Sequence, residues 1–306
     1  MRIFITGVSG YAGFHTALRL AAAGHQVTGL VRNTAQPRLD ILRTREIAIM
    51  SGDIAEPDGY RDVLAQSQVV IHTVLDKKRA KETDRTFFAA LASLPQHQGA
   101  RRRFIYTTGC AIVGNVDVPI IDESVEPDPA YPLAFRRALE LEALALNLGV
   151  VVLRPSFMFG NDGHNSVTAD WFAMAEAGDP VFRGDREKGW SWVHVDDLAE
   201  AYLLAAEADR SIDGEVFCIT DEQRPRCVDV MRACLSAAGY DGPISFEPPV
   251  KGDTISMWFD KNEFSTSAKA RRQLGWFARR LGVLDSIPAA YAAWKAAKRF
   301  GAVVSA

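Results

Sequence analysis

Short apolar runs alternate with amphipathic stretches through the first half of the chain. The apolar runs predict β-strands at residues 2–6, 26–31, 46–50, 68–73, 103–108 and 150–153. Apolar positions with helical spacing predict helices at residues 11–23, 58–66, 83–93 and 132–148. This alternation is typical of a parallel sheet covered by helices on both faces, so we expect an α/β fold with a doubly wound sheet of the Rossmann type.

The pattern becomes less regular after Arg154 and Pro155. It predicts helices at residues 166–177, 197–207, 227–238, 267–274 and 283–297, and strands at residues 215–219 and 244–247. We interpret residues 1–155 as the domain that holds the sheet and residues 156–306 as a smaller, mixed lobe. Some later elements are expected to return to the first sheet, so the two parts interleave and the boundary is approximate.

Composition and charge exclude several classes of protein. Of the 306 residues, 48% are hydrophobic and 24% charged, as in ordinary globular proteins, and the net charge of −3 gives no general attraction to nucleic acid. No apolar run is long enough to predict a membrane span, and the first residues lack the pattern of a signal peptide. Cys110, Cys218, Cys227 and Cys234 lack metal-site spacing, so we expect reduced thiols, no metal and a cytoplasmic location.

One glycine-rich turn carries the strongest candidate chemistry. It lies between the first predicted strand and the first predicted helix. Glycines permit a tight turn there and a close approach of the backbone to a pyrophosphate, while the N-terminus of the helix favours negative charge. We therefore expect residues 1–155 to bind NAD(P), with contacts from Gly7, Ser9, Gly10, Tyr11, Ala12 and Gly13.

The end of the second predicted strand is where the adenosine ribose would be recognised. An acidic residue there would bind the 2′-hydroxyl of NAD, but the chain has Arg32 instead, whose guanidinium suits the 2′-phosphate of NADP. The sequence favours NADP and leaves NAD open; a solvated surface arginine is the alternative. Asp53 is expected to accept a hydrogen bond from adenine while Ile54 packs on the ring, unless Asp53 only caps a turn.

Several motifs together resemble the extended short-chain dehydrogenase/reductases, most nearly their NAD-dependent epimerase/dehydratase branch. These are the glycine turn, Gly52-Asp53, His72, Leu153-Arg154-Pro155 with Phe159-Gly160, and residues 192–199 and 267–276. The resemblance covers nearly the whole chain. It implies a C-terminal lobe that binds a small-molecule substrate, and further cofactor contacts from Thr73, Val74, Leu75 and Lys77 and, at the nicotinamide end, Pro155 and Phe157.

The chain departs from the family at the residues that carry its chemistry. That chemistry normally uses a tyrosine and a lysine four residues apart, because the ammonium group lowers the pKa of the phenol that exchanges a proton with the substrate. Here Phe135 follows Tyr131 at that spacing. Alignment of Glu140 with the family's helix glutamate places Arg136 at the lysine position and Pro132 at the tyrosine position.

The resemblance therefore implies a modified catalytic set. Tyr131 is expected to donate the proton, Arg136 to supply positive charge, and Thr108 to hold the substrate oxygen, because Gly109 stands at the usual hydroxyl position. Cys110 is an alternative to Thr108, unless it is a buried, inert thiol. These departures resemble atypical members of the superfamily, some of which keep the cofactor fold without the standard triad.

The substrate side also differs from relatives that act on sugar nucleotides. They often carry an arginine four residues before the histidine of the 192–199 motif, where this chain has Trp190. The second half is rich in large side chains that form either an apolar pocket or a core: Trp171, Phe172, Trp190, Trp192, Met257, Trp258 and Phe259. His164, in a polar loop, is either an acid–base group or a surface residue, and His194 is interpreted as structural.

Three hypotheses follow for the function. The first is an NAD(P)-dependent oxidoreductase, a reductase or dehydrogenase, for a small carbonyl or alcohol. The second is an NAD(P)-dependent epimerase or dehydratase with a tightly held cofactor, and the third is a non-catalytic NADP-binding sensor. A homodimer through the helix predicted at residues 132–148 is a further hypothesis, and the apolar face of this helix suits packing on the sheet equally well.

Overall fold

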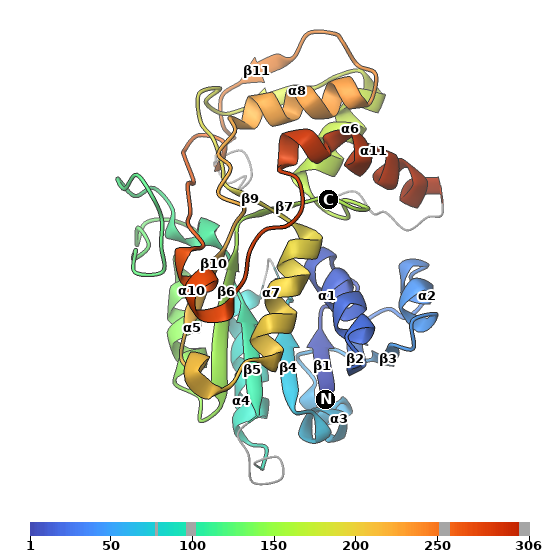
Figure 1. The fold of residues 1–306 in the computed structure, drawn as a ribbon, viewed down its shortest axis with the longest axis vertical. Helices are drawn as coiled ribbons and strands as arrows, with labels where there is room; N and C mark the ends of the chain where they lie inside the picture. The colour runs from blue at the N-terminus through green and yellow to red at the C-terminus, as the bar shows by residue number, and fades with distance from the viewer. Residues whose placement is uncertain (77–78, 96–101, 251–257, 300–306) are drawn as a thin grey trace.

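Seven parallel strands form the central sheet of the computed structural model, in the order β10-β6-β5-β4-β1-β2-β3 (Figure 1). They are β1 (Arg2–Thr6), β2 (Gln26–Val31), β3 (Ala48–Ser51), β4 (Val69–His72), β5 (Arg103–Thr107), β6 (Gly149–Pro155) and β10 (Val216–Ile219). The structure describes residues 1–76, 79–95, 102–250 and 258–299. The predicted Rossmann-type sheet is confirmed, and β10 returns to it from the second half of the chain to pair with β6.

Helices cover both faces of this sheet. One face carries α1 (Tyr11–Ala22), α2 (Arg38–Arg43), α7 (Val195–Glu207) and α10 (Ala268–Leu274). The other carries α3 (Arg61–Gln66), α4 (Ala80–Ala92) and α5 (Phe135–Leu144). Helices α1 and α7 pack directly against each other on the first of these faces although they are far apart in sequence. Short 3₁₀ turns are η1 (Pro57–Gly59), η2 (Cys110–Val113) and η3 (Arg210–Ile212).

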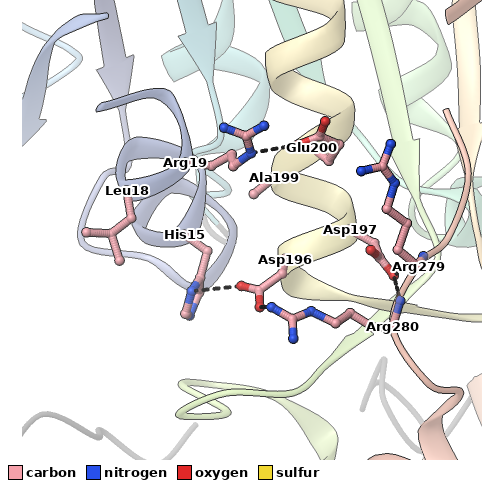
Figure 2. Close-up of a pocket in the computed structure, with 9 residues that line it drawn as sticks. All are labelled: His15, Leu18, Arg19, Asp196, Asp197, Ala199, Glu200, Arg279 and Arg280. Atoms are coloured by element: carbon pink, nitrogen blue, oxygen red, sulfur yellow. Dashed lines mark hydrogen bonds and ion pairs between the residues drawn. The ribbon is translucent and has the colours of Figure 1, made fainter. Parts of the chain in front are cut away.

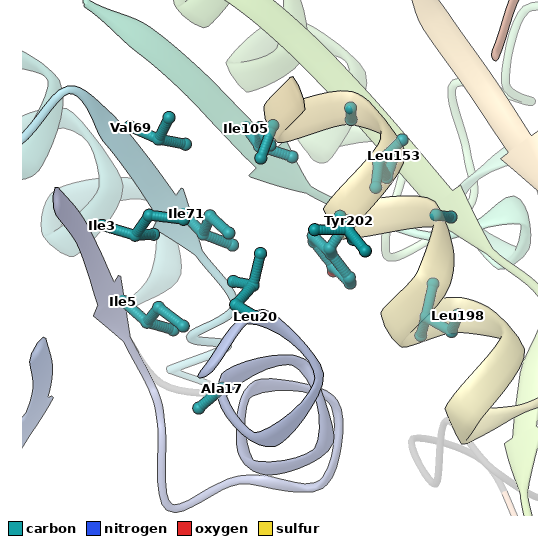
Figure 3. Packing of buried hydrophobic residues seen from close by; sticks show 14 of the residues in the cluster. Ile3, Ile5, Ala17, Leu20, Val69, Ile71, Ile105, Leu153, Leu198 and Tyr202 are labelled. Atoms are coloured by element: carbon teal, nitrogen blue, oxygen red, sulfur yellow. The ribbon is translucent and has the colours of Figure 1, made fainter. Parts of the chain in front are cut away.

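Alternation along each strand builds two separate cores, because neighbouring side chains of a strand point to opposite faces. In β1, Ile3 and Ile5 join the cluster under α1 and α7, while Phe4 joins the cluster under α3, α4 and α5. Figure 3 shows the first of these cores, where Leu20 of α1 and Tyr202 of α7 face the strands. Both faces are buried, which explains why the strands read as continuous apolar runs.

The rest of the chain forms a second lobe above the carboxyl ends of the strands (Figure 1). Its strands pair as β7 (Phe157–Phe159) with β9 (Trp192–His194) and as β8 (Val181–Arg183) with β11 (Ser245–Glu247). Its helices are α6 (Val167–Ala177), α8 (Cys227–Ala237) and α11 (Val283–Arg299). Trp171, Phe172, Trp190, Trp192 and Phe259 are buried in its hydrophobic core, Trp258 is partly buried, and Met257 lies outside the described residues.

The segment after α10 ties this lobe to the sheet. Trp276 donates from Nε1 to the carbonyl oxygen of Asp197 at the start of α7, at 2.8 Å. The backbone N–H groups of Arg279 and Arg280 donate to the Asp197 carboxylate at 3.1 and 3.0 Å. Elements from beyond residue 155 thus complete the sheet domain, and the two parts interleave.

Helices α5 and α2 differ from the sequence prediction. Helix α5 begins at Phe135 rather than at residue 132, and it ends at Leu144, so Tyr131 and Pro132 lie in the turn before it. Helix α2 was not predicted because six residues give too little periodicity to detect. Among the described residues, no helix is both long and apolar enough to cross a membrane.

A fully buried ion pair joins α5 to the end of β6. Arg154 donates from Nε and Nη2 to the two carboxylate oxygens of Glu140 at 2.9 and 2.5 Å. Neither side chain has any exposed surface, and Thr108 donates to the same carboxylate at 2.5 Å. In a low-dielectric interior each charge requires the other, so this pair fixes the distance between helix and strand.

Glu140→Gln tests this pair, because it leaves the Arg154 guanidinium buried without a counter-charge. We expect the free energy of unfolding to fall by about 3 kcal/mol, measured by urea denaturation. Glu142→Gln on the same helix is the matched control, because its pair with Arg85 is exposed to solvent and contributes little. Equal losses in the two variants would contradict this account.

Candidate functional site

The glycine-rich turn leaves no room for side chains between β1 and α1. Gly7 has a φ of +78°, and a Cβ there would lie 2.8 Å from Oγ1 of Thr73. A Cβ on Gly13 would overlap the carbonyl oxygen of Gly7. Thr73 follows β4 and holds the turn by donating to the carbonyl oxygen of Thr6 at 2.8 Å. The bare backbone therefore lies at the edge of the sheet, as a cradle for a pyrophosphate requires.

The N-terminus of α1 is free to bind an anion. Gly10 precedes the first residue of the helix and supplies no side-chain cap, and the first turn contains no acidic residue. The first N–H groups of a helix have no partner within it, and they carry the positive end of the helix dipole. This end of α1 fits the phosphates of a dinucleotide, which residues 7–13 would hold mainly through backbone groups.

The residues predicted to contact the adenosine and the middle of the cofactor lie around this turn. Arg32 directly follows β2; it is exposed, and its guanidinium has no hydrogen-bond or ion-pair partner among the residues that the structure describes. One carboxylate oxygen of Asp53 accepts from the backbone N–H of Ala55 at 2.9 Å, so Asp53 caps a turn, and Ile54 is buried. Ser9, Ala12, Thr73 and Val74 are partly exposed, Leu75 is exposed, and Lys77 lies outside the described residues.

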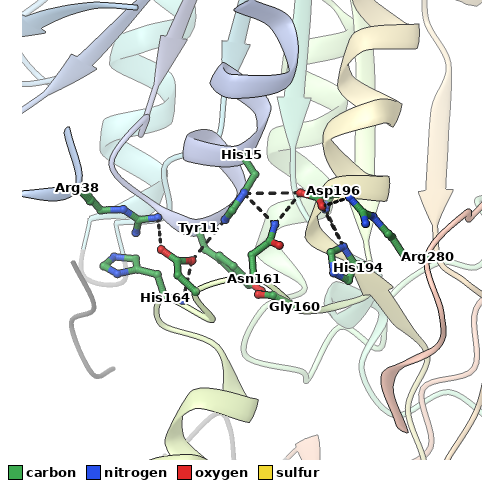
Figure 4. A network of polar contacts seen from close by, with 10 residues as sticks. Tyr11, His15, Arg38, Gly160, Asn161, His164, His194, Asp196 and Arg280 are labelled. Carbon is green, nitrogen blue, oxygen red and sulfur yellow. Dashed lines mark hydrogen bonds and ion pairs between the residues drawn. The ribbon is translucent and has the colours of Figure 1, made fainter. Parts of the chain in front are cut away.

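A polar network anchors the turn to the second lobe (Figure 4). The Tyr11 hydroxyl donates to the carbonyl oxygen of Gly160 beyond β7. Two residues further on, Asp162 accepts from Nη2 of Arg38 at 3.0 Å and contacts Nε2 of His15 at 3.4 Å. The network joins α1, α2 and the loop after β7, so the glycine turn and the second lobe are held in one arrangement.

Two histidines predicted from the sequence take part in this region. His164 is buried, and burial followed by the charge of Arg38 lowers its pKa to about 4, so its imidazole is neutral at physiological pH. His194 caps α7, because its Nδ1 accepts from the backbone N–H of Asp196 at 3.1 Å. Both contribute to the junction between the lobes.

A hollow of about 590 Å³ lies beside this network, between α1, α7 and Arg280 (Figure 2). Its charged walls are largely paired with each other: Arg19 contacts Glu200 at 2.6 Å, and Arg280 contacts Asp196 at 2.6 Å. None of its lining residues belongs to the glycine turn. We therefore place the candidate site at the turn and not in this hollow.

Two of the three predicted catalytic side chains already have partners within the protein. The hydroxyl of Thr108 donates to Glu140, as described above. Arg136 is buried in α5, where its Nη2 donates to the carbonyl oxygen of Thr107 at 2.7 Å. No hydrogen bond joins Arg136 to Tyr131 among the described residues. The roles assigned to Thr108 and Arg136 stay predictions.

Tyr131 has a partner that the sequence prediction missed. The Nζ atom of Lys261, from the C-terminal lobe, lies 4.5 Å from the centre of the Tyr131 ring and donates to the carbonyl oxygen of Gly114 at 2.9 Å. Both side chains are buried. Burial, followed by the charge of Glu263, raises the pKa of Tyr131 above its usual value. The only sequence signal for Lys261 is a charged residue within an aromatic stretch, far from Tyr131 along the chain.

Stacked aromatic rings lie beyond the end of β6, where the resemblance places the nicotinamide end of the cofactor. Pro155 is buried at the end of β6, and Phe157 follows it in β7. The Phe157 ring stacks on Trp190 with centroids 3.6 Å apart, and Trp190 stacks on Phe259 at 4.4 Å. Trp190 is completely buried between them. Among the described residues, no three side chains of His, Cys, Asp or Glu gather as a metal site would require.

Comparison with known proteins identifies the family of this chain. Residues 3–220 match the model of the NAD-dependent epimerase/dehydratase family. The chain belongs to that family. Its relatives include the 3-diazoavenalumate denitrifying reductase of a Streptomyces species, 24% identical over 90% of this chain and 95% of the relative.

Solved structures of the family share the fold. UDP-glucose 4-epimerase of Thermotoga maritima, solved with UDP-glucose, superposes with a TM-score of 0.81 at 20% identity, over 97% of this chain and all of that one. The dTDP-glucose 4,6-dehydratase of Bacillus anthracis, solved with NAD, has a TM-score of 0.84 at 15% identity, over 98% of each chain. The family and its structural neighbours are NAD-dependent enzymes.

Gly13→Ala tests the cradle, because the new methyl group would overlap the carbonyl oxygen of Gly7 and push the turn outward. We expect NAD(P)H to bind about tenfold more weakly or worse, equivalent to ~1.4 kcal/mol, in a calorimetric titration. Gly59→Ala is the control, since a Cβ there meets nothing within 4 Å. If a folded Gly13→Ala protein bound NAD(P)H with unchanged affinity, the proposal that the cofactor binds at this turn would be wrong.

Proposed function

We propose that this chain is an NAD(P)-dependent oxidoreductase that reduces a small carbonyl compound, or oxidises the corresponding alcohol, with a flat apolar body. The observation that carries the proposal is the stack of Phe157, Trp190 and Phe259. It fills with aromatic rings the place where relatives that act on sugar nucleotides often carry an arginine. Trp190 and Phe259 are buried in the core of the lobe, and Phe157, the partly exposed ring of the stack, would offer an uncharged apolar surface that disfavours a diphosphate and favours an apolar substrate. The similarity to a Streptomyces reductase supports the same choice.

The residues around the turn fit the cofactor. Gly7, Gly10 and Gly13 provide the cradle, and the N-terminus of α1 would bind the pyrophosphate. When bound, the nicotinamide supplies or accepts a hydride. Tyr131 would donate a proton to the substrate oxygen, and the Phe157 ring would orient the substrate and exclude water.

A second candidate is an epimerase or dehydratase, because the family and the solved structures above include both. Such an enzyme regenerates its cofactor in each cycle. It would retain NAD(P) through purification and show no net change in nicotinamide absorbance during turnover. A non-catalytic sensor would bind the cofactor and turn over no substrate.

The preference for NADP rests on Arg32 and is tested by Arg32→Ala. Loss of a charge-assisted contact with the 2′-phosphate should weaken NADPH binding by about tenfold to a hundredfold and leave NADH binding unchanged. Calorimetry with both nucleotides measures this. Arg45→Ala, another exposed arginine, is the control. If the variant weakened the binding of NADPH and NADH equally, Arg32 would not recognise the 2′-phosphate and would contribute only general surface charge.

The role of Tyr131 is tested by Tyr131→Phe. Removal of the phenol oxygen should lower kcat on a carbonyl panel by about a hundredfold or more, with NADPH affinity intact, because only the proton donor is lost. Stopped-flow measurement of NADPH oxidation follows the reaction. Full activity in this variant would sink the assignment of Tyr131.

A homodimer and a cytoplasmic location also stay predictions. Leu139 and Ala143 of α5 pack on the sheet. The predicted interface consists of Ala138, Leu141 and Ala145, which are exposed, and Leu148, which is partly buried against the sheet core. This face is available to a second copy of the chain. Light scattering at micromolar concentration measures the oligomeric state.

A further inference from the structure

A row of three polar side chains crosses the sheet next to the glycine turn. Thr6 of β1 pairs in register with His72 of β4, which pairs in register with Tyr106 of β5. All three side chains are completely buried. Register partners point to the same face of a sheet, so the row lies in the core under α3, α4 and α5.

The neighbouring row on the same face is apolar. Phe4, Val70 and Phe104 are register partners two residues earlier along the same strands, and all three belong to the hydrophobic core. Replacing a buried polar set with apolar side chains of similar volume is often neutral or stabilising, so the stability of the sheet alone does not call for a polar row. The polar row stands at the carboxyl edge, where the strands meet the glycine turn.

Asp84 of α4 joins the members of this row. Its Oδ1 lies 3.2 Å from Nε2 of His72, and its Oδ2 accepts from the Tyr106 hydroxyl at 2.5 Å. The other ring nitrogen of His72, Nδ1, lies 2.8 Å from Oγ1 of Thr6. Burial raises the pKa of Asp84, but the hydrogen bonds and charges around it, those of His72 first, outweigh burial and lower it. The ionised carboxylate therefore only accepts, and one chain of contacts runs from α4 to the last residue of β1.

Thr6 is the residue from which the glycine turn leaves the sheet. Its carbonyl oxygen accepts from the backbone N–H of Thr73 at 3.2 Å and from the Thr73 hydroxyl at 2.8 Å. The consecutive residues His72 and Thr73 thus hold Thr6 at its hydroxyl and at its carbonyl group. The same Thr73 hydroxyl packs against Gly7, where it leaves no room for a Cβ. A displacement of Thr6 would therefore move Gly7 and the start of α1 with it.

We propose that Asp84 is a positioning residue for the dinucleotide: through His72 and Thr6 it fixes the glycine turn where the backbone meets the pyrophosphate. Asp84 itself does not touch the cofactor. Hydrogen bonds from backbone N–H groups weaken steeply when their geometry changes, and a turn that is already ordered loses less entropy when the cofactor binds. The inference rests on cofactor binding at this turn and not on the reduction of a carbonyl.

Asp84→Asn keeps the size of the side chain but offers one accepting oxygen where the carboxylate offers two. It therefore loses either the contact with His72 or the contact with Tyr106. We expect NAD(P)H to bind about fivefold more weakly or worse in a calorimetric titration. Asp62→Asn, at an exposed position in the first turn of α3, is the matched control and should bind NAD(P)H as the wild type does. Equal affinities of Asp84→Asn and wild type would overturn the inference.

Thr6→Val tests the other end of the chain of contacts, because it removes only the hydroxyl that meets His72. It should weaken NAD(P)H binding to a similar extent, and weaker binding in Asp84→Asn alone would overturn the route through Thr6. Thr16→Val is its control, since Thr16 is buried in α1 and its hydroxyl has no hydrogen-bond partner among the described residues. His72→Phe keeps the ring stack with Tyr106 but loses both nitrogen contacts. His72→Asn should recover part of the affinity, because its amide can reach Thr6 from the position of Nδ1.

Hydrogen–deuterium exchange and thermal unfolding distinguish positioning of the turn from general support of the fold. In Asp84→Asn the amides of residues 7–14 should exchange faster than in the wild type, while those of β10, at one edge of the sheet, should not change. Lower thermal stability with unchanged exchange in the turn and unchanged NAD(P)H affinity would overturn the inference and leave these residues as part of the core. None of these measurements needs a substrate, so a protein that turned over no carbonyl would reject the proposed function and leave this test intact.

Discussion

The site of this protein depends on one constraint: all seven strands run parallel, so their carboxyl ends meet at a single edge. The residues that leave those ends include the glycine turn after β1, Thr73 after β4 and Ser156 after β6. None of these is close to another in sequence. The close packing of Gly7 against Thr73 then brings the backbone to the edge with no side chain in front of it. The cofactor cradle is a consequence of this packing.

Buried polar groups in this fold are of two kinds: those that pair with another side chain and hold the fold together, and those that have no partner in the part of the chain that the structure describes. Glu140 and Arg154 satisfy each other, and His72 contacts Asp84 at 3.2 Å within the sheet core. Such groups fix helix-to-strand distances. The hydroxyl of Tyr131 and the carboxylate of Glu263 have no partner among the described residues, although they are equally buried. Buried groups of this second kind are the ones that a ligand or water would satisfy.

The second lobe keeps contacts made by family motifs, but some of its other side chains differ from those that relatives often carry. Its ties to α7 through Trp276 and its cap at His194 use residues within the motifs that resemble the family. Its core instead has Trp190 stacked between two aromatic rings. Family membership therefore fixes the fold and the NAD-dependent class, whereas the substrate follows from side chains that differ between relatives.

The sequence by itself determined the parallel sheet, most of its elements and the glycine turn, because these depend on local periodicity and on residues adjacent in the chain. Alignment of Glu140 with the family's helix glutamate, which places Arg136 at the lysine position, stays a prediction. Only the tertiary structure brought Lys261 and Glu263 to Tyr131 and committed Thr108 to Glu140. Contacts between segments this far apart leave no periodic signal, and burial of a charged residue is decided by packing that only the folded chain contains.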